Sequence, residues 1–200
     1  MDERTHSIVS LLKRDHEHVA QLFALLESTA SGDLEEYFCE VREELVRHEV
    51  AEELIVYPAF RKAVPGGDAI ADSCIAEQAK AEEMLVAMEH RDDRGSPSLR
   101  GQLVELRQAV LKHAAHEEHD VLPALEAHEG HPELAGLGDL YEGALLAAPT
   151  HPHPHAPDSP PRNYIFSSIS STIDTVRDAM EAQRRQRDFR ADEPMQSTDP

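Results

Sequence analysis

The sequence is poor in cysteine, in basic side chains and in long apolar runs. Its two cysteines, Cys39 and Cys74, share no chelating spacing, so we expect reduced, partly buried thiols rather than a disulfide or redox pair. Nineteen basic residues stand against thirty-nine acidic ones, which gives a formal net charge of -20. This charge repels nucleic acid and anionic membranes but suits a protein that attracts cations, so we expect no nucleic-acid partner.

No apolar run is long enough to cross a bilayer, and the first residues lack the basic and apolar regions of a signal peptide. We therefore expect a cytoplasmic protein with no membrane partner. A chain of 200 residues has room for one ordinary domain with its own core, plus an appendage.

Glycine and proline occur in a few clusters, and the segments between them carry apolar residues at intervals of three and four. This period is typical of amphipathic helices, and no segment shows the alternation of a strand. We predict an all-α fold in which four helices form an up-down-up-down bundle, followed by a short fifth helix. The expected helices span about 5–31, 33–64, 68–91, 97–128 and 132–147.

The composition changes after the predicted bundle domain, residues 1–147. Residues 148–162 contain too many prolines for a helix, so we predict a semi-rigid linker rich in proline and histidine. Apolar residues at three-four spacing then predict a C-terminal amphipathic helix at 163–188, and residues 189–200 are expected to form a disordered tail. The apolar stripe of this helix needs a cover, so we predict a monomer with the helix docked or a homodimer formed through it.

One motif occurs twice, and both copies read His-x3-Glu-Glu-x4-Pro. The copies begin at His48 and His113, and their first glutamates are Glu52 and Glu117. Residues four apart lie on one face of a helix, so each copy aims an imidazole and a carboxylate at the same point. Two such helices facing each other would form a metal site, and these donors suit iron, manganese or zinc. The second glutamate of each copy is expected to be solvated or to orient a ligating imidazole.

Two further helices can add donors to this site. His16 shares a helix face with apolar residues, so we predict that it points inward as a third imidazole ligand. The segment 75–85 of the third helix contains no histidine, but Gln78 and Glu82 are four apart and share a face. Either residue could approach the metal, Glu82 as an anionic ligand and Gln78 through its carbonyl oxygen or a bound water.

Tyr57 is a tempting replacement for the absent imidazole. It lies nine residues after His48, and at about 100° per residue a regular helix turns it to the opposite side, away from the ligands. We therefore predict that Tyr57 and Pro58 serve packing and helix termination.

Together these motifs resemble the hemerythrin-like HHE cation-binding family. The resemblance covers roughly residues 5–147, and the tail is similar to that of actinobacterial members. It implies a non-haem centre of two carboxylate-bridged iron ions inside a four-helix bundle. The resemblance is compatible with the ions being oxo-bridged as well. The small-molecule ligand of this centre would be dioxygen, peroxide or nitric oxide. The family's ligands match, position by position, His16, His48, Glu52, His113 and Glu117.

Family members usually carry histidine where this chain has Gln78. The loss of one imidazole either opens a coordination position or weakens one metal site. Three hypotheses stay open. The chain binds or senses a small gas, or it is an enzyme that consumes peroxide or nitric oxide. The alternative is a mononuclear or weakly metallated iron-handling or structural helical protein without catalytic activity.

Overall fold

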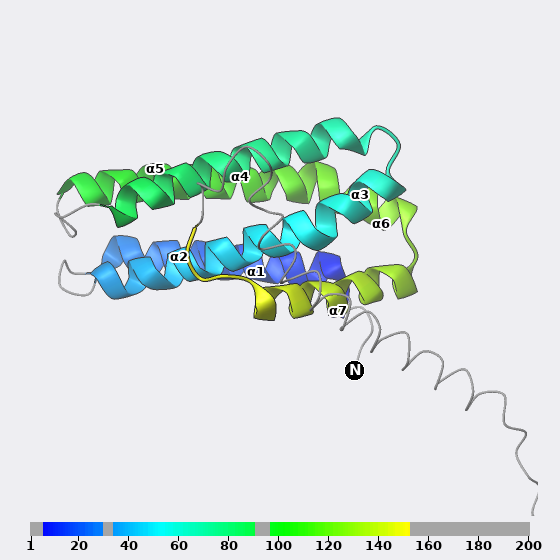
Figure 1. Cartoon of the computed structure of the whole chain (residues 1–200), viewed down its shortest axis with the longest axis horizontal. Coiled ribbons are helices and arrows are strands. Elements are labelled where there is room, and N and C mark those ends of the chain that lie inside the picture. The colour runs from blue at the N-terminus through cyan, green and yellow to red at the C-terminus, as the bar shows by residue number, and fades with distance from the viewer. Residues whose placement is uncertain (1–5, 30–33, 91–96, 153–200) are drawn as a thin grey trace, which may run out of the picture.

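The computed structural model describes residues 6–29, 34–90 and 97–152, and its regular elements within these ranges are helices. The long helices line up as rods along the length of the molecule (Figure 1). They are α1 (Ile8–Ser28), α2 with α3 (Leu34–Ala51 and Tyr57–Ala63), α4 (Gly67–Glu89), and α5 with α6 (Pro97–His116 and Leu122–His128). The predicted all-α bundle is confirmed.

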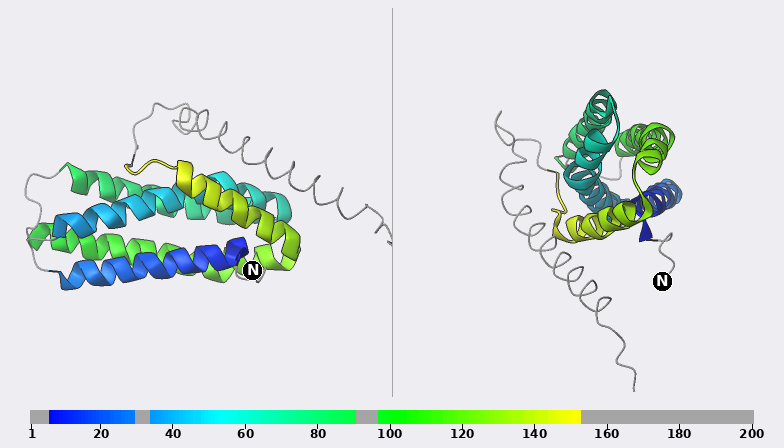
Figure 2. Two further views of the ribbon diagram at one scale, coloured as in Figure 1. Left: turned by 90° about the horizontal axis from the view of Figure 1, so that it is seen from below. Right: turned by 90° about the vertical axis from the view of Figure 1, so that its right-hand side faces the viewer.

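Neighbouring rods are joined by short connections, so they run in alternating directions. α1 packs on α2 and α5, while α4 packs on α5 and α3. The fifth helix, α7 (His131–Ala147), follows α6 and packs on α1 and α2. It therefore lies outside the four rods and crosses two of them, as Figure 2 shows from two sides.

Local signals explain where two of the helices begin. The Ser7 hydroxyl accepts a hydrogen bond from the Ser10 N–H at 3.3 Å, which caps the first turn of α1. Gly66 precedes α4 and has a φ of 79°, in the left-handed region that a side chain disfavours. The turn before α4 therefore depends on glycine at this position.

Two π-helical turns, which the sequence analysis did not predict, interrupt two of the rods. Glu52–Val56 joins α2 to α3, and Glu117–Val121 joins α5 to α6. Each turn begins at the first glutamate of a motif copy, and the motif proline, Pro58 or Pro123, lies two residues after the turn ends. Proline has no backbone N–H, so it cannot donate the hydrogen bond that a regular α-helix would make at its position. The π turn before it accommodates one extra residue within the helix. The expectation that Pro58 ends its helix was wrong, because α3 continues to Ala63.

The apolar core forms two clusters along the bundle. One cluster includes Leu12, Phe60 and Leu125, near α3, α6 and α7. The other includes Phe23 and Leu85, toward the opposite end of the rods. Between them lies a layer of buried polar side chains: His16, His48, Glu52, Gln78, His113 and Glu117.

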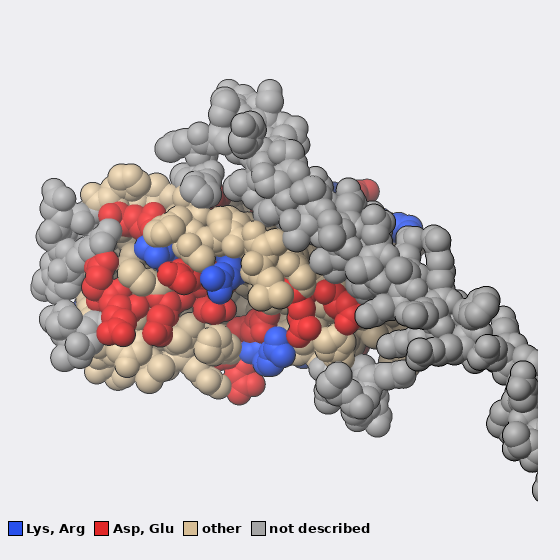
Figure 3. All heavy atoms as spheres, turned by 60° about the horizontal axis from the view of Figure 1, so that its bottom comes forward, with Lys and Arg blue, Asp and Glu red and all other residues tan. Residues whose placement is uncertain are grey.

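Acidic side chains outnumber basic ones on the described part of the face shown in Figure 3, in keeping with the net charge of -20. Cys39 is half-buried, Cys74 is buried, and both are free thiols. No helix within the described ranges combines the length and apolarity needed to cross a membrane. The predicted C-terminal helix (163–188) and tail (189–200), and the linker beyond Pro152, lie outside the described residues.

Candidate metal centre

Glu52 lies at the centre of the polar layer and is fully buried. Its Oε1 is 2.9 Å from Nε2 of His48, one turn earlier on α2. The same oxygen is 3.8 Å from Nε2 of His16 on α1, and Oε2 is 3.8 Å from Nε2 of His113 on α5. One carboxylate therefore faces three imidazoles that come from three rods.

Glu117 begins the second π turn and faces two of the same imidazoles. Its Oε2 lies 3.2 Å from Nε2 of His16 and 3.6 Å from Nε2 of His113. Glu117 is also fully buried. Two carboxylates thus face the same two imidazoles, His16 and His113.

The residues present fit a metal ion. Two ligand atoms about 2.1 Å from one ion, at 90° to 110° to each other, lie about 3.0 to 3.4 Å apart. The separations of 2.9 and 3.2 Å in this layer are close to that spacing, and the separation of 3.8 Å is wider by about 0.4 Å. One donor atom from each of four residues lies within 4.8 Å of all the others, in the set His16, His48, Glu52 and Glu117.

Unpartnered polar atoms give a second indication of a cation. His16 Nε2, Glu52 Oε1 and Glu117 Oε2 are buried and have no hydrogen-bond partner. A buried polar atom without a partner costs free energy, so such atoms are rare in folded proteins. A metal ion between them would satisfy all three at once.

The outer ring nitrogens of the three histidines are held by partners outside the layer. His16 Nδ1 lies 2.9 Å from Glu118 Oε1, and His113 Nδ1 lies 3.4 Å from Glu77 Oε2. Such partners orient an imidazole and leave Nε2 free for a metal. Glu118 is the second glutamate of its motif copy, which was expected to be solvated or to orient a ligating imidazole. Its contact with His16 corresponds to the second of these roles.

Glu77 is anchored by charge as well as by His113. Its carboxylate lies 2.9 Å from Lys112 Nζ and 3.0 Å from His116 Nδ1. Partial burial opposes ionisation, but these neighbours outweigh it and hold the pKa of Glu77 at about 2. The group behind His113 is therefore a carboxylate throughout the neutral range.

The carboxylates also perturb the histidines. Burial alone would lower the pKa of His16, but Glu117 and Glu52 raise it to about 11. The pKa of His113 rises to about 9 against the same opposing burial, chiefly through Glu52. Burial favours the neutral form of Glu52, yet His48 and the other imidazoles hold its pKa well below the usual range. Without a metal ion, protons supply the positive charge of the site.

The structure corrects the prediction for Tyr57. Its hydroxyl points into the polar layer, where it donates a hydrogen bond to Glu117 Oε1 at 2.8 Å and lies 3.5 Å from His113 Nε2. The extra residue of the π turn at Glu52–Val56 rotates everything after it by about 100° relative to a regular helix. The repeated proline inside both predicted helices is the sequence signal that could have revealed this rotation.

The two candidate ligands on α4 differ in position. Gln78 is buried, and its amide Nε2 donates to Glu52 Oε2 at 2.6 Å, so it reaches the site through a carboxylate. Its carbonyl oxygen, through which it was expected to approach the metal directly, is buried without a hydrogen-bond partner. Glu82 is only half-buried and is not among the clustered donors. Ligation by either residue stays a prediction.

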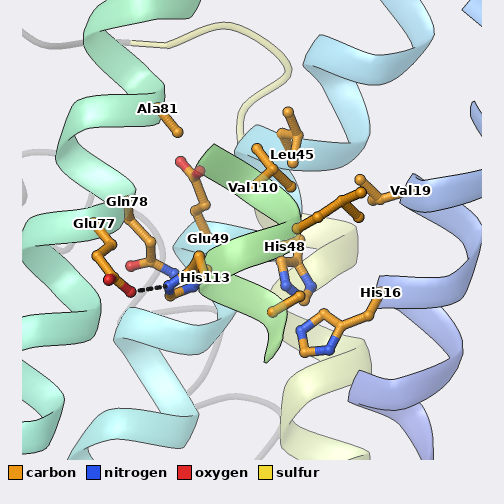
Figure 4. A pocket seen from close by; sticks show the side chains of 12 residues that line it. His16, Val19, Leu45, His48, Glu49, Glu77, Gln78, Ala81, Val110 and His113 are labelled. Atoms are coloured by element: carbon orange, nitrogen blue, oxygen red, sulfur yellow. Dashed lines mark hydrogen bonds and ion pairs between the residues drawn. The ribbon is translucent and has the colours of Figure 1, made fainter. Parts of the chain in front are cut away.

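A small cavity adjoins the donors on the side of the second apolar cluster (Figure 4). His16, His48 and His113 line one part of it, and apolar side chains such as Val19 and Val110 line another. Its volume of about 20 Å³ gives room for a molecule the size of water or dioxygen, but not for a larger substrate.

Comparison with known proteins agrees with this geometry. The family model for the hemerythrin HHE cation-binding domain matches residues 7–125, more than half of the chain. The chain belongs to this family. A hemerythrin-like protein of Schizosaccharomyces pombe, described as uncharacterized, is 34% identical over 139 residues, which cover 69% of this chain and 68% of the relative. No solved structure matches significantly.

Membership in the hemerythrin HHE family agrees with the sequence resemblance and with a metal-binding role for the His/Glu cluster. The matched range contains every residue predicted as a ligand. It ends before α7, which nevertheless packs on the π turn that carries Glu52.

Proposed function

We propose that this chain is a non-haem di-iron protein that binds or transforms a small molecule inside its bundle. The observation that carries the proposal is the sharing of His16 and His113 between the carboxylates of Glu52 and Glu117. His16, His48, Glu52, His113 and Glu117 would hold the metal. Iron bound there would supply a redox-active Lewis acid for dioxygen, peroxide or nitric oxide.

The choice of iron rests on the donor chemistry. The site offers imidazole nitrogen and carboxylate oxygen, whereas structural zinc sites usually recruit cysteine thiolates. The nearby thiol is not a competing donor, because burial raises the pKa of Cys74 to about 12 and Cys74 is not among the clustered donors. The protein is thus suited to a hard, redox-active cation.

The chain's own residues would limit and protect the chemistry. The small cavity has room only for a molecule about the size of water or dioxygen, and its apolar side chains keep bulk water away. Tyr57 keeps its proton at neutral pH, since burial and then the charges of Glu52 and Glu117 raise the pKa of its hydroxyl. Its O–H therefore fixes one oxygen of Glu117 and leaves the other, Oε2, facing the imidazoles.

A second candidate function is a mononuclear iron protein, and Gln78 is the observation that favours it. The Gln78 amide donates a hydrogen bond to Glu52 Oε2, so this oxygen would be less available to a second metal ion. If that hydrogen bond persists, one ion would bind near His16 and His48, and the second would bind weakly.

The test is the metal content of protein purified without added metal, with its near-ultraviolet absorption. Two irons per chain, with the band of a bridged ferric pair, would support the di-iron proposal. One iron per chain without that band would favour the mononuclear candidate. Zinc, or no metal in a folded chain, would contradict both.

The variant Gln78→His tests whether Gln78 limits the number of metal ions that the chain binds. It introduces the imidazole usual in the family. If the wild-type chain binds one iron, the variant should bind two. Titrations with dioxygen, peroxide and nitric oxide then separate the activities. A lasting dioxygen adduct indicates a carrier or sensor, whereas turnover of peroxide or nitric oxide without an adduct indicates an enzyme.

A further inference from the structure

Tyr141 on α7 makes two hydrogen bonds inside the bundle. Its side chain is fully buried, and its hydroxyl lies 2.8 Å from Nδ1 of His48 and 3.1 Å from Oδ2 of Asp15. The other two histidines of the site have carboxylates behind them, Glu118 and Glu77. Among the three, His48 is the one whose Nδ1 is held by a phenol.

The directions of these hydrogen bonds follow from the partners. Asp15 is an acceptor, so the Tyr141 O–H donates to it. The phenol oxygen is then free to accept the Nδ1–H of His48. For a neutral His48, the form that would bind a metal ion, this arrangement selects the tautomer whose lone pair lies on Nε2, the nitrogen 2.9 Å from Glu52 Oε1.

α7 is built to approach the bundle closely at this place. Gly138 lies one turn before Tyr141, and a Cβ at Gly138 would collide with the backbone oxygen of His6 and lie 3.3 Å from the backbone nitrogen of Ile8. Such contact leaves no room for a side chain. A second contact pins the same turn, because Asp139 lies 2.6 Å from His6 Nε2.

We propose that α7 contributes to the metal centre through Tyr141, which is the positioning residue for His48. The match to the family model ends at residue 125, before α7 begins. Tyr141 sets the tautomer and the ring orientation of His48, and Asp15 in turn orients the phenol. The inference rests on the proposed metal site, since it assigns a role toward that metal.

The test compares the affinity for Fe²⁺ of the full-length metal-free chain and of Tyr141→Phe. Fe²⁺ is titrated without oxygen against a competing chelator. Removing the hydroxyl keeps the packed ring but leaves His48 without its partner, and the loss of such partners typically weakens metal binding by about 10- to 100-fold. We expect a loss in this range, with the far-ultraviolet circular dichroism of the metal-free chain unchanged.

Two controls separate positioning from packing. Leu134→Val loosens the packing of α7 in the core without touching the hydrogen bonds, so it should lower the melting temperature and leave the Fe²⁺ affinity unchanged. Tyr37→Phe removes a hydroxyl from a tyrosine beside the other apolar cluster and should change neither quantity. If Tyr141→Phe does not fold, Asp15→Asn weakens the same hydrogen bonds from the α1 side and should lower the affinity several-fold.

The outcomes distinguish this inference from the proposed function. If the wild-type chain binds no Fe²⁺, the proposed function fails and this inference fails with it. If the wild type binds Fe²⁺ and Tyr141→Phe binds it equally well, only the inference is overturned. An equal loss of affinity in Leu134→Val would also overturn it, because packing alone would then explain the effect.

Discussion

Metal binding to this chain should be strongly coupled to proton release. With pKa values of about 11 for His16 and about 9 for His113, both imidazoles are protonated in the metal-free protein at pH 7. An ion that is held by both Nε2 atoms must displace both protons. Each displaced proton contributes a factor of ten in affinity per pH unit, so the affinity should rise about 100-fold per unit up to pH 9.

An ordinary histidine site behaves differently. With unperturbed pKa values of about 6.5, the affinity would level off above pH 7. The region between pH 7.5 and 8.5 therefore separates the two cases. Zn²⁺, which has no redox chemistry, can be titrated there against a competing chelator, and the protons released per ion can be counted in an unbuffered solution held at constant pH.

The expected result is close to two protons per bound ion at pH 7.5. His18→Gln, on the exposed side of α1, should leave this number unchanged, whereas His16→Gln should lower it by one. A flat affinity between pH 7.5 and 8.5, with fewer than one proton released, would refute the assignment of protonated imidazoles to the metal-free site.

The same protons affect the stability of the metal-free chain. The folded-state pKa values of His16 and His113 lie above the unfolded value of 6.5. Their stabilisation is therefore fully present below pH 6.5, and it is lost as pH rises through about 9 and then about 11. The urea midpoint of metal-free protein should fall over this window, and bound metal should reduce the fall.

Three further predictions concern stability. Tyr57→Phe leaves Glu117 Oε1 without its donor, so it should cost about 1–3 kcal/mol in urea unfolding of the metal-free chain, and an unchanged midpoint would contradict the hydrogen bond. Phe60→Ala opens a cavity at a fully buried position and should cost about 3–5 kcal/mol, whereas Leu25→Ala, at a half-exposed position, should cost much less in the same assay. Chelation should lower the melting temperature but leave the helical circular dichroism intact, since two apolar clusters flank the site; unfolding on chelation would show that the metal is required for the fold.

Much of this fold was predictable because helical periodicity is a local property. Apolar residues at three-four spacing marked five helices, and the observed boundaries lie within a few residues of those predicted. The repeated motif likewise placed His48 and Glu52 on one helix face, and the structure shows Nε2 and Oε1 of this pair 2.9 Å apart. Membership in the hemerythrin HHE family agrees with this interpretation.

Tyr57 shows where local reasoning failed. A wheel of 100° per residue assumes an unbroken α-helix, and one inserted residue at the π turn invalidates it for every later position. The proline after each π turn was visible in the sequence, but Pro58 was interpreted as a helix end. Its recurrence at the same offset in both copies indicated a feature inside the helix.

The sequence by itself determined the helices, the spacing of the His/Glu pairs and the acidic charge, because each depends on neighbours within a few turns. Only the tertiary structure decided which group stands behind each imidazole. Glu118 reaches His16 across 102 residues, and Tyr141 reaches His48 across 93. Such contacts depend on how closely whole helices approach, and at α7 that approach is set by the missing side chain of Gly138.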